Sequence, residues 1–311
     1  MKKLLFIYNP NSGKGTLKAK VSDIVDIFVK AGYEVTIYPT QCYQDAYNKV
    51  LGLENMYDLV VCSGGDGTLD EVMTAMMRRE IKMPVGYIPA GTTNDFANSL
   101  RIPRDTLKAA YNAVNGARFA CDIGAFNDDY FVYIAAFGLF TDVSYQTKQE
   151  VKNVLGHLAY VLEGMKRLYN IPSYRIKVTH DGEVIEDDFV FGMATNSRSV
   201  GGFRNMIGKK VRFDDGVFEV TLIRTPKNAK ALQEIISALL DEKVNTEHMF
   251  TFRTGNITFE SVEEIPWTLD GEYGGSHDNV CIQNKQKALQ IMVVPEKKAS
   301  LMELPDTEEK E

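Results

Sequence analysis

Gly64-Gly65-Asp66-Gly67-Thr68 is the stretch that decides the fold, because it follows an apolar run at residues 59–62 and opens a helical pattern. Three glycines around one aspartate are costly in conformational entropy for a plain connection. Backbone amides and a carboxylate at a helix N-terminus could hold a phosphate group together with magnesium. The alternative is a capped helix start, with Asp66 or Thr68 as the cap, but a cap needs one polar residue and not three glycines.

Apolar strands alternate with amphipathic helices on both sides of this segment. Because the strands are continuously apolar, they predict a parallel sheet covered by helices on both faces. The expected strands are residues 3–8, 35–38, 59–62 and 85–88. The expected helices are residues 17–30, 45–53, a helix after Gly67, 94–100 and 107–115.

Two further polar loops follow strands of the same predicted sheet. The first, Asn9-Pro10-Asn11-Ser12-Gly13, lacks P-loop spacing and alone is equally typical of an ordinary turn. The second contains Gly91-Thr92-Thr93-Asn94, whose polar side chains could instead cap the next helix. Ligands bind beyond the carboxyl ends of strands in such sheets, so the three loops together predict a nucleotide site lined mainly by backbone.

The alternation of strands and helices ends near residue 123. Short strand patterns follow, and Asp181-Gly182 between two of them is a strong hairpin signal. We therefore expect a nucleotide-binding α/β domain at residues 1–123 and a β-rich, mostly antiparallel domain at 124–285, while residues 286–311 either close the second domain or return to the first. The expected strands are 130–137, 174–179, 183–194, 217–223, 250–253, 257–259, 280–283 and 289–294, with a helix at 141–168.

Composition excludes several classes of protein. The 311 residues are 44% hydrophobic and 25% charged, which is ordinary for a globular chain, and the net charge of −7 does not suit non-specific binding to nucleic acid. The four cysteines lie far apart, without a CxxC pair, as expected in a reducing compartment. The longest apolar stretch, residues 131–140, is too short to span a bilayer, so we expect a cytoplasmic protein.

The three loops, in this order, resemble those of the diacylglycerol kinase catalytic family. Length and two-domain layout are most similar to its bacterial soluble lipid kinases. The resemblance implies a parallel sheet like that of NAD kinases and phosphofructokinases, followed by a mostly antiparallel β-sandwich. Asp70 is a departure, because the family usually has Asn there.

The resemblance also implies ATP and Mg²⁺ as cofactors. Asp66 would anchor magnesium and phosphate, and a structural magnesium would lie on the Asp215 carboxylate and the carbonyls of Arg212 and Val217. From the residues alone, Asp214-Asp215-Gly216 is more simply a tight turn. The implied nucleotide-binding residues are Asn9, Pro10, Asn11, Ser12, Gly13, Thr40, Gly64, Gly65, Asp66, Gly67, Thr68, Glu71, Gly91, Thr92, Thr93 and Asn94.

Leu269-Asp270-Gly271-Glu272 carries the expected catalytic acids. Alone, it is a loop-like turn with two acids. It matches a late motif of the resembled family, which implies Glu272 as the general base and Asp270 as its neighbour and metal contact. A positioned carboxylate can take the proton of a lipid hydroxyl as that hydroxyl attacks the γ-phosphate of ATP. The expected product is a phosphatidic-acid-like lipid; the alternatives are an NAD kinase-like enzyme or a non-catalytic nucleotide- or lipid-binding protein.

Five basic residues and no acid lie between Phe189 and Phe213. Apolar side chains are interleaved with them, so this stretch is either a solvated loop or a peripheral contact with an anionic bilayer. The second interpretation would place the protein at the inner face of the membrane, with its lipid substrate. The oligomeric state stays open, with a homodimer among the options. The basic residues are Arg198, Arg204, Lys209, Lys210 and Arg212.

Overall fold

The computed structural model describes residues 1–15, 17–54, 56–138, 172–197, 211–240 and 247–295. Contacts divide the chain into two compact units. The first comprises Met1–Ile123, Arg212–Asp215 and Gln286–Glu311; the second comprises Gly124–Val211 and Gly216–Lys285. The boundaries drawn from sequence, 1–123 and 124–285, stay a prediction, and the contacts differ from it by adding residues 212–215 to the first unit. No described helix is long and apolar enough to cross a membrane.

The first unit is built on a parallel sheet. Its own strands run in the order β2-β1-β3-β4, and all three pairings between them are parallel. The last part of strand β13 (Glu272–Val293) pairs in parallel with β4 through Ile291 and Val85. The strands are β1 (Lys2–Tyr8), β2 (Tyr33–Pro39), β3 (Leu59–Gly64) and β4 (Val85–Pro89).

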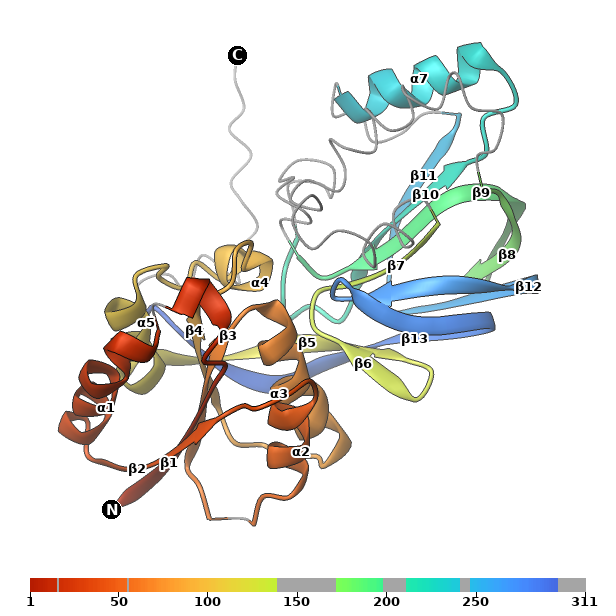
Figure 1. The fold of residues 1–311 in the computed structure, drawn as a ribbon. Coiled ribbons are helices and arrows are strands. Elements are labelled where there is room, and N and C mark those ends of the chain that lie inside the picture. The colour runs from red at the N-terminus through yellow and green to blue at the C-terminus, as the bar shows by residue number, and fades with distance from the viewer. Residues whose placement is uncertain (16, 55, 139–171, 198–210, 241–246, 296–311) are drawn as a thin grey trace, which may run out of the picture. The chain divides into compact units, whose positions relative to one another are not determined.

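Helices cover both faces of this sheet. Figure 1 shows α1 (Val21–Lys30) and α5 (Thr106–Asn115) on one face, and α2 (Asp45–Leu51) and α3 (Asp66–Arg78) on the other. Both faces of the inner strands are therefore apolar, and Leu4 through Ile7 are 0% exposed. The short elements are a 3₁₀ turn at Ser12–Gly15, another at Lys18–Lys20, and α4 (Asp95–Ser99).

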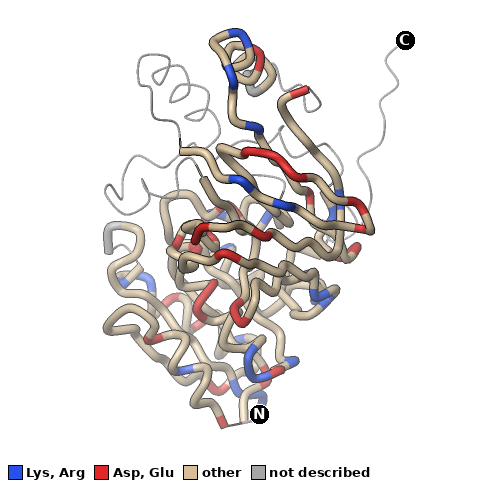
Figure 2. The backbone as a smooth tube through the Cα atoms, turned by 90° about the vertical axis from the view of Figure 1, so that its right-hand side faces the viewer, with Lys and Arg blue, Asp and Glu red and all other residues tan. Residues whose placement is uncertain are grey.

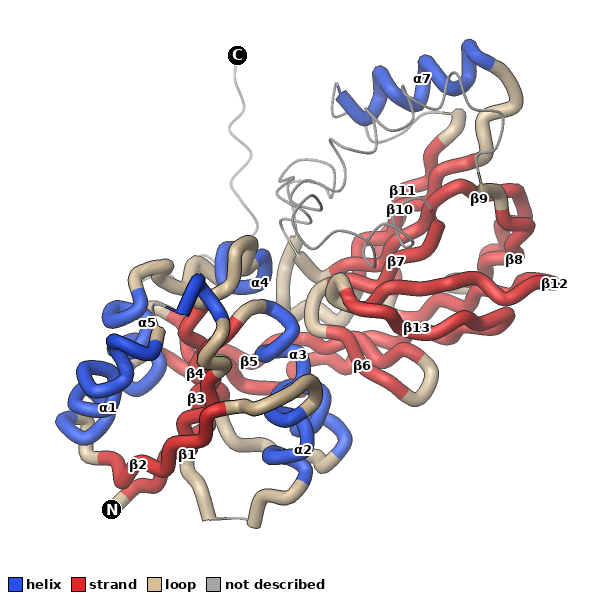
Figure 3. Tube along the Cα trace, in the orientation of Figure 1, coloured by secondary structure: helices blue, strands red, loops and turns tan. Residues whose placement is uncertain are grey.

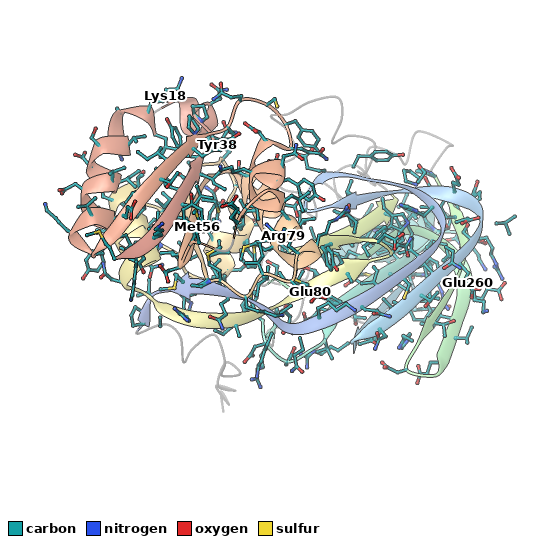
Figure 4. All side chains as sticks on the ribbon, turned by 90° about the horizontal axis from the view of Figure 1, so that it is seen from below. Lys18, Tyr38, Met56, Arg79, Glu80 and Glu260 are labelled. Atoms are coloured by element: carbon teal, nitrogen blue, oxygen red, sulfur yellow. The ribbon has the colours of Figure 1, made fainter. Side chains whose placement is uncertain are left out.

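The two helices on the second face are joined by a side chain. Arg79 follows α3, and its guanidinium donates hydrogen bonds to the carbonyls of Val50 and Leu53 at the end of α2 (Figure 4). Cys62 and Cys121 are buried free thiols, and burial raises the pKa of Cys121 to about 12. These two cysteines are therefore inert packing residues.

Strands predominate in the described part of the second unit (Figure 3), and they pair antiparallel. Its strand order is β11-β10-β9-β7-β12-β13, β8 pairs with both β9 and β12, and β5 pairs with β6 and β13. Helix α7 (Ala229–Leu240) lies between β10 and β11 in the chain. Strand β5 (Ala117–Phe126) begins in the first unit and ends in the second. The other strands are β6 (Asp129–Phe131), β7 (Ile134–Gly138), β8 (Tyr174–His180), β9 (Glu183–Thr195), β10 (Phe218–Arg224), β11 (Met249–Thr254) and β12 (Asn256–Leu269).

Trp267 is the largest buried side chain of this unit's core. It is 1% exposed, and its ring lies 4.8 Å from that of Phe137, 5.1 Å from Phe259 and 5.2 Å from Phe126. Such edge-on and tilted contacts add to the free energy gained from the buried area. The indole therefore fixes the end of β12, three residues before Asp270.

The α/β class of the first unit and the antiparallel class of the second confirm the expected fold class. Strand β5 and helix α7 were not predicted, and three predicted details were wrong. Residues 130–137 form two strands, β6 and β7, and not one; the patterns at 257–259 and 280–283 are parts of the much longer β12 and β13; and β13 also takes in residues 289–293. The expected helix at 141–168, the basic residues 198–210 and the charged end 296–311 lie outside the described residues.

Candidate functional site

Three loops meet at the carboxyl end of the parallel sheet. The backbone of Asn9 donates to the carbonyl of Ser63 (2.8 Å), and that of Ala90 donates to the carbonyl of Gly64 (2.7 Å). The first and third loops are thus both fastened to the end of β3. The Thr40 amide donates to the carbonyl of Tyr8 (2.9 Å), which places Thr40 at the same edge. The sequence-based expectation that the strand ends bring these residues together is therefore met by the backbone.

The glycines allow the loops to pack backbone against backbone. A Cβ on Gly91 would lie 2.7 Å from the Cα of Gly65, closer than real Cβ contacts allow. A Cβ on Gly64 would lie 2.5 Å from the Cβ of Thr68. No side chain fits at either position, so the surface formed by these loops consists largely of peptide groups.

Helix α3 begins at this surface without a side-chain cap. Its N-cap residue is Gly65, in extended conformation, and no side-chain hydrogen bond caps the helix. The alternative interpretation of GGDGT, in which Asp66 or Thr68 caps the helix, is therefore wrong. The N-terminus of this 13-residue helix, with the backbone of Gly91 packed against Gly65, favours an anion such as a phosphate group.

Asp66 connects the second loop to the third. Its Oδ2 accepts hydrogen bonds from the Thr93 hydroxyl and from the Asp95 amide, both at 3.3 Å. Both bonds are long, so a stronger ligand of the carboxylate can replace them at low cost. Asp66 is thus placed where the sequence predicted a phosphate and metal anchor, at the first turn of α3.

Asn94 organises the third loop through its own side chain. Its backbone is left-handed (φ 52°), its Oδ1 accepts the Gly91 amide (2.9 Å) and its Nδ2 donates to the Gly91 carbonyl (2.8 Å).

Tyr87 of β4 donates to Asn94 Oδ1 (3.4 Å) and to the Gly64 carbonyl (3.2 Å), and burial raises the pKa of Tyr87 well above the ordinary value. The sequence analysis did not identify Tyr87 as part of the site, although a tyrosine in so apolar a strand indicates a buried hydroxyl with a hydrogen-bond partner.

Glu71 contacts the start of helix α2 through its carboxylate. Its carboxylate accepts hydrogen bonds from the amides of Gln44 (3.0 Å) and Ala46 (3.1 Å), at the start of α2. Desolvation raises the pKa of Glu71, although these amides favour the charged form. Asp70, the departure from the family pattern, accepts a hydrogen bond from Thr74 (3.3 Å) one turn along the same helix. The nucleotide contact expected of Glu71 stays a prediction.

A buried acidic cluster lies in the first unit near the expected structural magnesium. Asp214 is 3% exposed, and its carboxylate lies 3.3 Å from Arg212 Nη2 and 4.0 Å from Lys287 Nζ. Asp122 is also buried and accepts the Lys287 amide (2.8 Å). Asp215 is only half-buried. Asp214 thus already lies beside two cations, and the structural Mg²⁺ expected on Asp215 stays a prediction.

Few protein side chains are available as ligands for Mg²⁺ at these positions. No group of three or more His, Cys, Asp or Glu that could hold a metal occurs within the described ranges. Nucleotide-bound Mg²⁺ usually keeps waters and needs only one or two carboxylates, so Asp66 fits such an ion. Arg212 and Asp215 fall in the first unit and Val217 in the second, and their joint role as ligands stays a prediction.

The Leu269–Glu272 segment is a tight hairpin and not a loop. Leu269 pairs with Glu272 across β12 and β13, and the two turn residues, Asp270 (φ 51°) and Gly271 (φ 87°), both have positive φ. Positive φ at both central positions is the signature of a type I′ turn, for which Asp-Gly is a favoured pair. Glu272 is exposed as the first residue of β13.

The Asp270 side chain points into the protein. It is 5% exposed, and its oxygens accept the amides of Val132 (2.5 Å), Tyr133 (2.9 Å) and Ile134 (2.9 Å). Three amide donors satisfy a carboxylate well and favour its charged form. The three amides fix this carboxylate in place, and the metal contact expected of Asp270 stays a prediction.

Comparisons with known proteins agree with this geometry. Residues 3–126 match the family model of the diacylglycerol kinase catalytic domain, and residues 136–293 match that of the YegS C-terminal NAD kinase beta sandwich-like domain. The chain belongs to the diacylglycerol kinase catalytic-domain family. It is 34% identical over 278 residues to a diacylglycerol kinase of Bacillus subtilis (strain 168), covering 88% of this chain and 91% of that one. A diacylglycerol kinase of Staphylococcus carnosus (strain TM300) is 32% identical over 275 residues, covering 88% and 90%.

A solved structure shows the same fold. A crystal structure of a candidate diacylglycerol kinase from Bacillus anthracis str. Sterne superposes with a TM-score of 0.81 at 27% identity, covering 95% of this chain and 96% of that one. The resemblance drawn from the three loops is thus confirmed, as are the parallel sheet and the β-sandwich it implied. As a member of this family the chain is a kinase, and a kinase uses ATP as phosphoryl donor.

Proposed function

We propose that this kinase transfers the γ-phosphate of ATP to a hydroxyl of diacylglycerol or a related lipid, giving a phosphatidic-acid-like product. The observation that supports this most is the uncapped start of α3 at Gly65, where Gly91 packs against it and leaves no room for a side chain. Such a surface suits the phosphates of a nucleotide. The names of the relatives supply the class of acceptor.

The residues divide the chemical work. The α3 N-terminus and the loops around Gly64 and Gly91 bind phosphate oxygens through backbone amides. Asp66 would hold Mg²⁺, which neutralises charge on the β- and γ-phosphates. Glu272, exposed at the start of β13, takes the proton of the lipid hydroxyl, because an alcohol is a poor nucleophile until a base accepts its proton.

We also propose a cytoplasmic protein that touches the inner face of the membrane to reach its lipid. The sequence feature behind this is the basic stretch from Arg198 to Arg212, which contains no acid. Along the described backbone, basic and acidic residues are interspersed (Figure 2). Anionic lipids attract clustered lysine and arginine by about 1 kcal/mol for each residue near the surface.

The first experiment is a lipid-panel kinase assay. Purified protein is incubated with labelled ATP, Mg²⁺ and mixed micelles that contain diacylglycerol, monoacylglycerol, ceramide or sphingosine, and with NAD in a parallel reaction. We expect phosphate transfer to at least one lipid and none to NAD. Transfer to NAD without lipid would identify an NAD kinase-like enzyme instead. ATP binding without transfer to any acceptor would identify a non-catalytic binding protein.

A further inference from the structure

We infer that Tyr133 and Asp270 are positioning residues, which hold the hairpin that carries Glu272 in its reactive place. The inference rests on the proposed lipid kinase function, in which Glu272 is the base. It gives a role to two buried side chains, 8% and 5% exposed, that phosphate binding and proton transfer do not use.

All four polar atoms of Asp270 make hydrogen bonds to residues 132–134, at the junction of β6 and β7. Its amide donates to the Ile134 carbonyl (2.9 Å), and its carbonyl accepts the Tyr133 hydroxyl (3.3 Å). Its carboxylate accepts three successive amides, those of residues 132, 133 and 134. The partners are 136 to 138 residues away in the chain, so these contacts fix the turn to a distant strand and not to itself.

Tyr133 is in turn fixed from β9. Its carbonyl accepts the Thr195 hydroxyl (2.6 Å) and the Asn196 amide (3.0 Å), at the end of that strand. A buried network in which each member is satisfied is rigid, and its bonds are stronger than those in water. The Tyr133 hydroxyl therefore adds a side-chain bond to the four hydrogen bonds that the backbone of residues 132–134 makes with Asp270.

The ends of β12 and β13 next to the turn are also held firmly. Leu269 is 6% exposed, and a Cβ on Gly274 would lie only 2.6 Å from its Cγ, so β12 and β13 pack closely just beyond the turn. A Cβ on Gly271, by contrast, would meet no atom within 4 Å. The turn is thus held from inside while its outer side, followed by Glu272, remains accessible to a substrate.

This arrangement matters because a general base acts only within hydrogen-bond reach of the proton it removes. A displacement of about 1 Å at a reacting group can cost on the order of a hundredfold in rate. Glu272 itself is exposed, so its position depends on the turn that precedes it. Loosening the turn should lower the rate of the chemical step without changing how ATP binds.

Tyr133→Phe tests this directly, since it deletes one hydroxyl and leaves the carboxylate of Asp270 and that of Glu272 intact. We expect kcat for the best lipid acceptor to fall about tenfold, the effect of about one hydrogen bond, with the KM for ATP unchanged. Tyr130→Phe is the matched control, because its hydroxyl makes no hydrogen bond among the described residues; it should keep the kcat of the unmodified protein. Assays are run well below the melting temperature of each variant.

A double mutant separates positioning from a general loss of structure. If Tyr133 acts through Glu272, then Tyr133→Phe should cause no further loss in a Glu272→Gln background, because the group being positioned is gone. An equal tenfold loss in both backgrounds would overturn the inference, as would an unchanged kcat in the single variant. If the unmodified protein phosphorylates no lipid at all, the proposed function fails; if it does and Tyr133→Phe is neutral, only this inference fails.

Discussion

Glu272→Gln is expected to lower lipid-dependent phosphate transfer by about a hundredfold to ten-thousandfold, the usual contribution of a general base. Glutamine has nearly the same shape but cannot accept the proton of the attacking hydroxyl. Because Glu272 is exposed, the substitution should leave the melting temperature within a degree or two of the unmodified protein. The measurement is kcat on the best lipid from the panel, together with thermal unfolding.

The control for charge is Glu264→Gln, which removes an exposed carboxylate from β12 of the same hairpin. It should keep full activity. ATP affinity should survive in both variants, because neither residue belongs to the three nucleotide loops. Unchanged turnover in Glu272→Gln would remove this residue as the base and leave the family assignment untouched.

The parallel sheet was predictable because its information is local. Continuous apolar strands and amphipathic helices reveal themselves within windows of a few residues, and glycines after a strand mark the loops. Strand β5 escaped because Arg118 and Asp122 interrupt its apolar pattern. Asp122 accepts a hydrogen bond from the amide of Lys287, 165 residues away, and no local sequence pattern reports such a partner.

The hairpin that carries Glu272 escaped although its signal was present. Asp181-Gly182 predicted a hairpin correctly, with φ values of 46° and 83°. Asp270-Gly271 has the same dipeptide and nearly the same conformation, at 51° and 87°. The difference lies in the flanks, because clear period-2 strands surround the first pair, while Gly274-Gly275 follows the second and suggests a loop. The strand there is held by pairing with β12, a long-range contact.

Contacts between distant residues also decide what each acid of the site does. Asp270 and Glu272 are two residues apart and chemically alike, yet one is buried on three amides and the other is exposed. Glu71 follows the glycine-rich loop closely in sequence but turns to the start of α2. The sequence could identify the group of candidate acids, and only the fold shows which of them are buried on backbone amides and which are exposed.

Gly91→Ala is expected to lower ATP affinity at least tenfold, or about 1.4 kcal/mol. The new Cβ would lie 2.7 Å from the Cα of Gly65 and 2.8 Å from Asn94 Oδ1, so the second and third loops must move apart. Gly91 does not have positive φ, so backbone strain makes no contribution and the clash alone decides the result. Overpacking of this kind also costs about 1–3 kcal/mol of the free energy of unfolding. Isothermal titration with a non-hydrolysable ATP analogue and thermal unfolding measure the two effects.

Gly52→Ala supplies the comparison that makes this result interpretable. Its Cβ would meet only the Asn48 carbonyl at 3.5 Å and that of Lys49 at 4.0 Å, which is ordinary contact, and it lies at the end of α2. It should change neither stability nor ATP binding. If Gly91→Ala lowers the melting temperature but binds the analogue as tightly as Gly52→Ala does, the packing of the loops is not what forms the phosphate site. ATP would then have to bind elsewhere on the first unit, because the start of α3 cannot keep its geometry once Gly65 has been displaced.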